Sequence, residues 1–214
     1  MYIPKQFQQD KESLIKAIKE IKLGALIIFS EGNFFINHIP FIIKEDAESI
    51  ILEGHVAKAN EIWKVANPQN KTTVIFQGAH SYIHPNWYPS KAKNHKSVPT
   101  WNYQAVHCYG HSQSQQSEEW ILNHLIELTN HNEKSQTNPW SVSDAPDQYI
   151  KDLVKGIIGI RIKVEKIEGA LKMSQNHPEE NRLGVIDGLS KSQKPSECEV
   201  ARLMIQIEAD RKKF

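Results

Sequence analysis

The stretch from Thr73 to Gly110 constrains the fold most, because two β-rich runs enclose a segment interrupted by prolines. The first run, 74–76, is short and apolar like a buried strand, and the last, 101–109, is rich in aromatic residues. Pro85, Pro89 and Pro99 lack the amide hydrogen that a central strand requires, so they confine the segment between the runs to loops or sheet edges. Aromatic rings beside rigid loops suit a planar ligand, and they would equally fill a β-barrel core.

Other patterns predict short strands with helices inserted among them. Asp10 caps a helix that reaches Ile21 and ends at Gly24, and a turn at 31–33 joins strands 25–30 and 34–43 in a well-buried hairpin. A turn follows at Glu45 and Asp46. Further strands are expected over 49–53, 73–77, 103–112 and 156–168, and Gly169 is expected to turn the chain after the last of them. The segment 78–84 is expected to be a second strand or a bulged return. One helix is expected after Asn60, one over 118–130 with Ser117 as its cap, a short one that ends at Val154, and a last one from about Ser196. The segment 89–98 is expected to be a mobile surface loop. The pattern predicts a mainly β protein with added helices, of the α+β class.

The 214 residues suffice for one sizeable domain with a small appendage. Because the composition becomes polar after Pro178, we expect a main domain over 1–176 and a helical extension packed on it over 177–214. No apolar run is long enough to cross a bilayer, so no membrane association is expected. Two distant cysteines, Cys108 and Cys198, suit free thiols in a reducing cytoplasm.

The sequence contains no recognisable catalytic or metal-binding motif. His80 and His84, like His107 and His111, are four residues apart, which on a strand separates them by about 13 Å, too far to share one ion. Cys108 and His107 would point to opposite faces of a strand, so Cys108 is interpreted as a packed core thiol. We therefore assign no catalytic and no metal-ligating residue, and leave open whether the protein is an enzyme.

Two polar segments have the composition of anion sites. In 54–60, GHVAKAN, small residues precede a helix start, where free amides and Lys58 would suit a phosphate, although an ordinary helical turn with an exposed lysine has the same pattern. In 172–176, KMSQN, lysine, hydroxyl and amide groups could hydrogen-bond a phosphate. The alternative is a loop whose polar side chains satisfy its own backbone.

Five sequence blocks, taken in order, resemble the PaiB family of FMN-binding negative transcriptional regulators. The central block is FQGAHSYIHPNWY followed by VPTWNYQAVHCYG, and the others are MYIPKQF, INHIPF, GHVAKAN and KMSQN. The chain departs from the family pattern at three positions, Asn37, His84 and Met173.

The resemblance implies an FMN-binding split β-barrel of the pyridoxamine-phosphate-oxidase-like superfamily, dimeric, with the cofactor at the subunit interface. It places FMN beside two groups of residues: His38, Gly54, His55, Ala57, Lys58 and Asn60, and Trp101, Asn102, Tyr103, Lys172, Ser174, Gln175 and Asn176. One face of the segment Trp101–Asn102–Tyr103 would stack on or fence the isoalloxazine, and Asn102 would reach its pyrimidine edge. The KMSQN loop would contact the ligand or the other subunit. The family implies a negative transcriptional regulator. The alternatives are a flavin-dependent oxidoreductase and, because histidine is abundant, a haem- or other small-molecule-binding dimer.

DNA binding receives little support from charge. The chain has 26 basic and 25 acidic residues, and its densest basic stretches are only 91–96 and 211–213. Phosphate neutralisation supplies most non-specific affinity, so weak, steeply salt-dependent DNA binding is the most that we expect.

Overall fold

The computed structural model describes residues 1–45 and 49–211. These residues fall into two compact units, each of which draws on separate parts of the sequence. The first unit comprises Met1–Leu14, Gln77–Val106 and the chain from Glu168 onward, and the second comprises Ile15–Phe76 and His107–Ile167.

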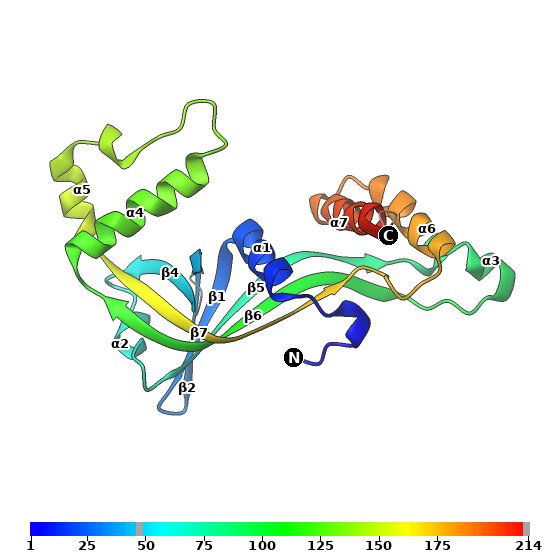
Figure 1. Cartoon of the computed structure of the whole chain (residues 1–214), viewed down its shortest axis with the longest axis horizontal. Coiled ribbons are helices and arrows are strands. Elements are labelled where there is room, and N and C mark those ends of the chain that lie inside the picture. Colours follow the sequence, from blue (N-terminus) through cyan, green and yellow to red (C-terminus); the bar gives the residue numbers. More distant parts are fainter. Residues whose placement is uncertain (46–48, 212–214) are drawn as a thin grey trace. The chain divides into compact units, whose positions relative to one another are not determined.

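Within the described residues, seven strands form one sheet in the order β2-β1-β5-β6-β7-β4-β3 (Figure 1). The strands are β1 (Leu23–Ser30), β2 (Asn33–Pro40), β3 (Ile42–Glu45), β4 (Ile50–Ala57), β5 (Lys71–Ile83), β6 (Thr100–Gln115) and β7 (Ile157–Lys172). Strand β1 pairs antiparallel with β2 and β5, and strand β4 pairs antiparallel with β3 and β7. The three longest strands, β5, β6 and β7, contribute residues to both units.

The helices lie between and after the strands. They are α1 (Lys11–Ile21), α2 (Ile62–Val65), α3 (Ser90–Asn94), α4 (Glu118–Glu133), α5 (Asp147–Val154), α6 (Glu179–Ser190) and α7 (Pro195–Arg211), with 3-10 turns η1 (Lys5–Phe7), η2 (Pro85–Trp87) and η3 (Val142–Asp144). No helix in the described ranges is long and apolar enough to cross a membrane.

Two helix starts confirm the predicted caps. The Asp10 carboxylate accepts a hydrogen bond from the Ser13 amide at 2.7 Å, and this bond lowers the pKa of Asp10. The Ser117 hydroxyl accepts one from the Trp120 amide at 3.3 Å. Both caps occupy backbone donors that the first helical turn leaves unpaired.

The core of the second unit follows from strand alternation. On β1, Leu26 and Ile28 are fully buried, and so are Val74 and Phe76 on the neighbouring β5. Ile160 and Ile162 of β7 continue this layer. Because side chains two positions apart share a face, each strand supplies one apolar row to the interior.

At one end of this unit the strands approach too closely for any side chain at Gly54 of β4. A Cβ there would lie 2.9 Å from the Pro40 carbonyl oxygen and 3.1 Å from Ile39. The glycine therefore lets the end of β2 reach β4, two strands that are not neighbours in the sheet order.

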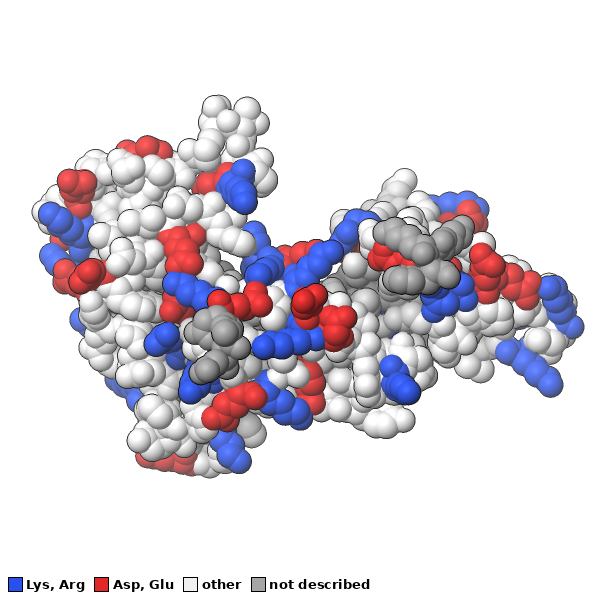
Figure 2. Space-filling model, in the orientation of Figure 1, with Lys and Arg blue, Asp and Glu red and all other residues white. Residues whose placement is uncertain are grey.

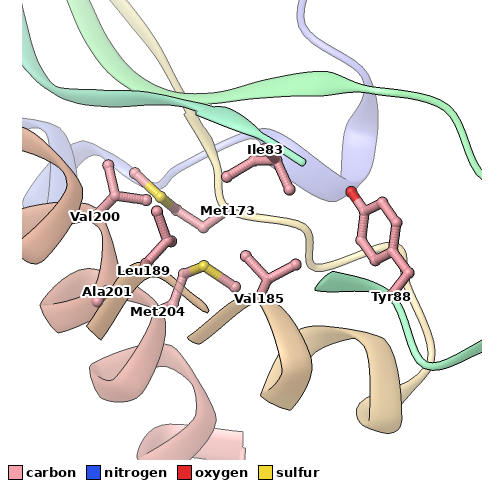
Figure 3. Close-up of a cluster of buried hydrophobic side chains, with 8 residues drawn as sticks. All are labelled: Ile83, Tyr88, Met173, Val185, Leu189, Val200, Ala201 and Met204. Atoms are coloured by element: carbon pink, nitrogen blue, oxygen red, sulfur yellow. The ribbon is translucent and has the colours of Figure 1, made fainter. Parts of the chain in front are cut away.

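In the first unit, α6 and α7 cover one face of the strand ends (Figure 1). A buried cluster forms there, with Tyr88 at the end opposite Val200 and Ala201 (Figure 3). It consists of Ile83, Tyr88, Met173, Val185, Leu189, Val200, Ala201 and Met204. Within the predicted extension, the described residues form α6 and α7, whose apolar side chains join this cluster.

Several expected boundaries were wrong. Gly24 lies inside β1 and α1 ends three residues earlier, where Lys22 adopts a positive φ of 60°. Gly169 lies inside β7, which continues to Lys172, and residues 71–83 form one strand rather than two. Strand β4 continues through Ala57, a short helix occupies 90–94, and the chain after Pro178 forms two helices rather than one.

The hairpin of β1 and β2 was predicted in place but is not well buried. Glu31 and Gly32 have positive φ angles of 49° and 79°, the conformation that a two-residue hairpin turn requires. However, Phe34 is 69% exposed and Ile36 57% exposed, and the expected strand over 34–43 is split into β2 and β3. Phe34 and Ile36 lie on the outward face of β2, whereas Ile39, on the alternate face, is buried. The turn expected at Asp46 lies outside the described residues.

Candidate functional site

The KMSQN segment borders a cavity of about 370 Å³ in the first unit. The start of β6, the end of β7 and the residues before α6 form its walls. Its polar and charged lining includes Lys96, Thr100, Asn102, Lys172, Ser174, Asn176, His177 and Asn181. No Asp or Glu side chain lines the cavity among the described residues, so its charged groups are all basic.

Gln175 shapes the loop that follows β7. Its amide nitrogen donates to the Leu171 carbonyl, and its amide oxygen accepts from the Met173 backbone at 2.6 Å. Ser174 has a positive φ of 62°, and its carbonyl accepts the His177 amide. Gln175 therefore satisfies its own backbone, which was the alternative reading of this loop, and Ser174 is turned inward.

Asn102 anchors this loop from β6. It is fully buried, its amide nitrogen lies 3.0 Å from the Ser174 hydroxyl, and the same nitrogen lies 3.4 Å from the Met204 sulfur of α7. The structure therefore brings Asn102 and the KMSQN loop, two of the predicted site segments, into direct contact. It also shows that the Asn102 amide is largely committed to protein partners.

Lys172 carries an isolated charge in the cavity wall. Its ammonium donates to the Thr100 hydroxyl at 2.6 Å, and no ion pair to it is found within the described part of the chain. Burial lowers the pKa of Lys172. Burial and the nearby Lys172 charge also lower the pKa of His177.

Tyr88 completes the wall and was missed by sequence reasoning. Its ring stacks on His177 with centroids 4.8 Å apart and planes 13° apart, and the residue is 2% exposed. Within the described residues, its buried hydroxyl makes no hydrogen bond of standard geometry. Burial raises the pKa of Tyr88, and the adjacent Ser174 hydroxyl partly opposes that rise.

The other predicted aromatic residues face away from this cavity. Trp101 is 53% exposed and, with Tyr103, lies on the strand face opposite to Asn102. It joins a row of rings, 6.2 Å from both His80 and Tyr82, while Tyr82 is 4.7 Å from His84. The structure thus separates Trp101 and Tyr103 from Asn102, which the prediction had grouped together.

The remaining predicted residues lie in the second unit, at the end of β4. Asn60 exchanges hydrogen bonds with Asn37 of β2, the shorter at 2.8 Å, and His38, Ala57 and Lys58 are exposed. The Lys58 and Asn60 amides donate to Gly156 and Ala57 carbonyls, so these two donors are already occupied. An anion at this junction would therefore meet the Lys58 ammonium rather than these amides.

His55 points to a buried partner rather than to the open junction. Its Nδ1 lies 3.1 Å from Nε2 of His124, whose ring stacks on Trp120 with centroids 5.3 Å apart. Burial lowers the pKa of His55, and burial, His55 and Lys44 lower that of His124 to about 4. Among the described residues, no group of three His, Cys, Asp or Glu side chains is placed to hold a metal ion.

Cys108 lies where the sequence predicted, whereas several residues of the cavity were not predicted. Cys108 is 1% exposed and burial raises its pKa to about 12, which confirms a packed core thiol. Tyr88, Lys96, Thr100, His177 and Asn181 were not predicted as site residues, because they come from separate stretches that only the tertiary fold joins.

Comparison with known proteins agrees with the fold. The family described as "Putative FMN-binding domain" matches residues 1–166. The chain is 32% identical over 205 residues to "Protease synthase and sporulation protein PAI 2" of Bacillus subtilis, covering 95% of this chain and 96% of that protein.

Two solved structures share the architecture at low sequence identity. The flavocytochrome Anf3 from Azotobacter vinelandii is 11% identical, with a TM-score of 0.54 over 78% of this chain and 69% of its own. The FAD and heme binding protein from Mycobacterium smegmatis is 9% identical, also with a TM-score of 0.54, over 82% of this chain and 78% of its own. The chain therefore belongs to the FMN-binding, PaiB-like family and has the flavin-binding split-barrel fold, with FMN as the family's cofactor.

Proposed function

We propose that this protein binds FMN at the junction after β4 and acts as a flavin-dependent negative regulator of transcription. The observation that carries this proposal is that exposed His38 and Lys58 lie with the half-buried Asn37–Asn60 pair where β2 and β4 meet. An ammonium, an imidazole and two amides match the phosphate and ribityl hydroxyls of FMN. When bound, FMN supplies redox chemistry, and these side chains bind and orient it.

Lys58 is the residue through which this proposal can be tested. No ion pair to Lys58 is found within the described residues, whereas the nearby Lys64 is paired with Glu61. Lys58→Ala should weaken FMN binding by about 1.5–3 kcal/mol, the range for hydrogen bonds to charged groups. The measurement is fluorescence quenching of FMN, with Lys64→Ala as the control. Equal affinity of a folded Lys58→Ala variant and the parent protein would remove Lys58 from the site.

We propose further that the protein is a homodimer. The row of His80, Tyr82, His84 and Trp101 is exposed on one face of the first unit, and an exposed row of rings is typical of a surface that a partner covers. Sedimentation should give a dimer at micromolar concentration, and Trp101→Lys should shift it toward monomer. A monomeric parent protein would contradict this proposal.

Direct DNA binding contributes little to the proposed regulation. In the basic stretch, Lys93 pairs with Glu180 at 2.6 Å and Lys91 donates to Asn86. Arg211 donates to the Gln175 carbonyl, and Lys212 and Lys213 lie outside the described residues. Basic and acidic side chains are interspersed on the face that Figure 2 shows.

We expect only weak, salt-dependent DNA affinity, with sequence preference supplied by a partner. Fluorescence anisotropy at physiological salt tests this expectation. Nanomolar, sequence-selective binding by the purified protein would overturn it, and alanine at Lys91, Lys93 and Lys96 would then test that stretch as the contact.

A flavin-dependent oxidoreductase is the second candidate, because the cavity beside KMSQN has the size of a small-molecule site. Bleaching of bound FMN by a nicotinamide reductant, followed by acceptor-dependent reoxidation at catalytic rates, would favour it. Reduction with no acceptor specificity would leave the regulator as the better assignment.

A further inference from the structure

We propose that the cavity of the first unit is a second ligand site, separate from the flavin, for a small organic anion bearing a carboxylate or phosphate group. It is lined by Tyr88, Asn102, Lys172, Ser174, His177 and Asn181. The proposal does not depend on the role assigned to Lys58. It rests on the charge and the hydrogen-bonding capacity of this cavity.

Charge is the first argument. The cavity brings Lys172 and Lys96 together without a carboxylate among its described lining residues. The Lys172 ammonium has a single protein partner, the neutral Thr100 hydroxyl, and an ammonium can donate three hydrogen bonds. Partly buried cations are normally paired, so an anion in the cavity would supply the missing counter-charge.

The Tyr88 hydroxyl is the second, independent observation. Tyr88 is 2% exposed and lines the cavity, and its hydroxyl, which lies beside the Ser174 hydroxyl, makes no hydrogen bond of standard geometry to any described residue. Leaving a buried hydroxyl unpaired is costly, and such groups in native proteins are nearly always satisfied. An oxygen of a bound anion would accept this hydrogen bond while also contacting Lys172.

The walls are held in place before any ligand binds. Asn102 and Ser174 bond each other, and the Asn181 amide bonds Ser90 through both its oxygen and its nitrogen. Asn102, Ser174 and Asn181 are each at most 4% exposed. A site whose polar walls are already ordered loses little entropy on binding.

The junction of His38 and Lys58 belongs to the second unit, whereas every residue that lines this cavity belongs to the first unit. The family resemblance grouped Lys172 and Ser174 with the residues beside FMN, and we assign them here to a second ligand instead. A small effector or substrate that acts together with the flavin fits this arrangement.

The test uses the FMN-loaded protein and two probe anions, inorganic phosphate and succinate, each in calorimetric titration at constant ionic strength. At least one should bind with one-site stoichiometry, and the tighter anion identifies the preferred group. Lys172→Met should weaken that binding by about tenfold or more, and Tyr88→Phe by about fivefold. Lys93→Met removes an exposed lysine of the same unit that is paired with Glu180, so it should change affinity less than about twofold.

FMN affinity is measured in parallel and should stay unchanged in Lys172→Met and Tyr88→Phe. Absence of saturable binding of both probes, or equal loss in all three variants, would overturn the proposal. A tenfold loss of FMN affinity in Lys172→Met would also overturn it, because the cavity would then belong to the flavin site. Tyr88→Phe keeps the ring that stacks on His177, which guards against loss of fold.

Discussion

A buried cation between α6 and α7 is paired with a carboxylate, whereas the cation in the wall of the neighbouring cavity has no counter-ion among the described residues. Between the helices, Arg182 forms two hydrogen bonds with the Glu208 carboxylate, at 2.6 and 2.8 Å, and donates a third to the His177 carbonyl. In the cavity, Lys172 faces only a hydroxyl. A charge with all its partners supplied by the protein is structural, whereas a charge left without a counter-ion marks a place for a ligand.

The largest effect is expected from breaking the satisfied pair. Glu208→Gln leaves Arg182 buried without its counter-charge, which should cost about 3–5 kcal/mol of unfolding free energy. Urea denaturation measures this loss. The control is Glu199→Gln on the same helix, whose exposed pairing with Arg202 should be worth less than about 1 kcal/mol. Equal losses in the two variants would show that burial does not distinguish these pairs.

The next largest loss of unfolding free energy is expected from a buried neutral histidine, His124, in the second unit. The pKa of His124 falls from 6.5 to about 4 in the folded protein, so the unfolded chain binds the proton more tightly. Stability should therefore be full above pH 6.5 and fall as the pH drops from 6.5 toward 4, by about 3 kcal/mol in total.

Urea midpoints measured at several pH values check this dependence, and His124→Asn should flatten it. The groups that act on His124 are His55 and Lys44, and His55 has a lowered pKa of its own. A parent protein whose stability does not change between pH 6.5 and 4 would contradict the assignment of a neutral His124.

The cavity lysine should behave unlike either group. Because Lys172 has no counter-ion to lose, Lys172→Met should change the unfolding free energy of the ligand-free protein by less than about 1 kcal/mol, while weakening anion binding by about tenfold or more. Urea denaturation with and without the probe anion separates the two effects. A loss comparable to that of Glu208→Gln would mean that Lys172 is a structural group.

Local sequence signals predicted the features that depend on local chemistry. The caps at Asp10 and Ser117 and the hairpin turn were found because a few adjacent residues determine them. Gly24 and Gly169 were misread as breaks, since a glycine that a neighbouring side chain packs against looks the same in sequence as a turn glycine. Helix α6 escaped notice because Gly184 and Gly188 interrupt its apolar pattern.

The candidate site was predictable only in part, for the same reason. The KMSQN segment was recognisable from its composition and family resemblance, and the structure places Asn102 beside it. Nothing in the sequence connects Tyr88 with His177, because their stacking depends on how separate segments fold together. The direction of Trp101, away from Asn102, follows from strand alternation once that strand is known to begin at Thr100.

The smallest expected change in stability concerns the two thiols, one of which is enclosed by the protein while the other is open to a reagent. Cys108 is 1% exposed and burial raises its pKa to about 12, so almost no thiolate forms at neutral pH. Cys198 is exposed at the start of α7.

The native protein should therefore react with one equivalent of a thiol reagent at pH 8, and Cys198→Ser should react with none until denaturant is added. Neither result depends on stability, because an exposed cysteine to serine change alters unfolding free energy by less than about 0.5 kcal/mol. Rapid labelling of both thiols in the native protein would show that the β6 core opens readily, and the assignment of Cys108 to a closed core would then fail.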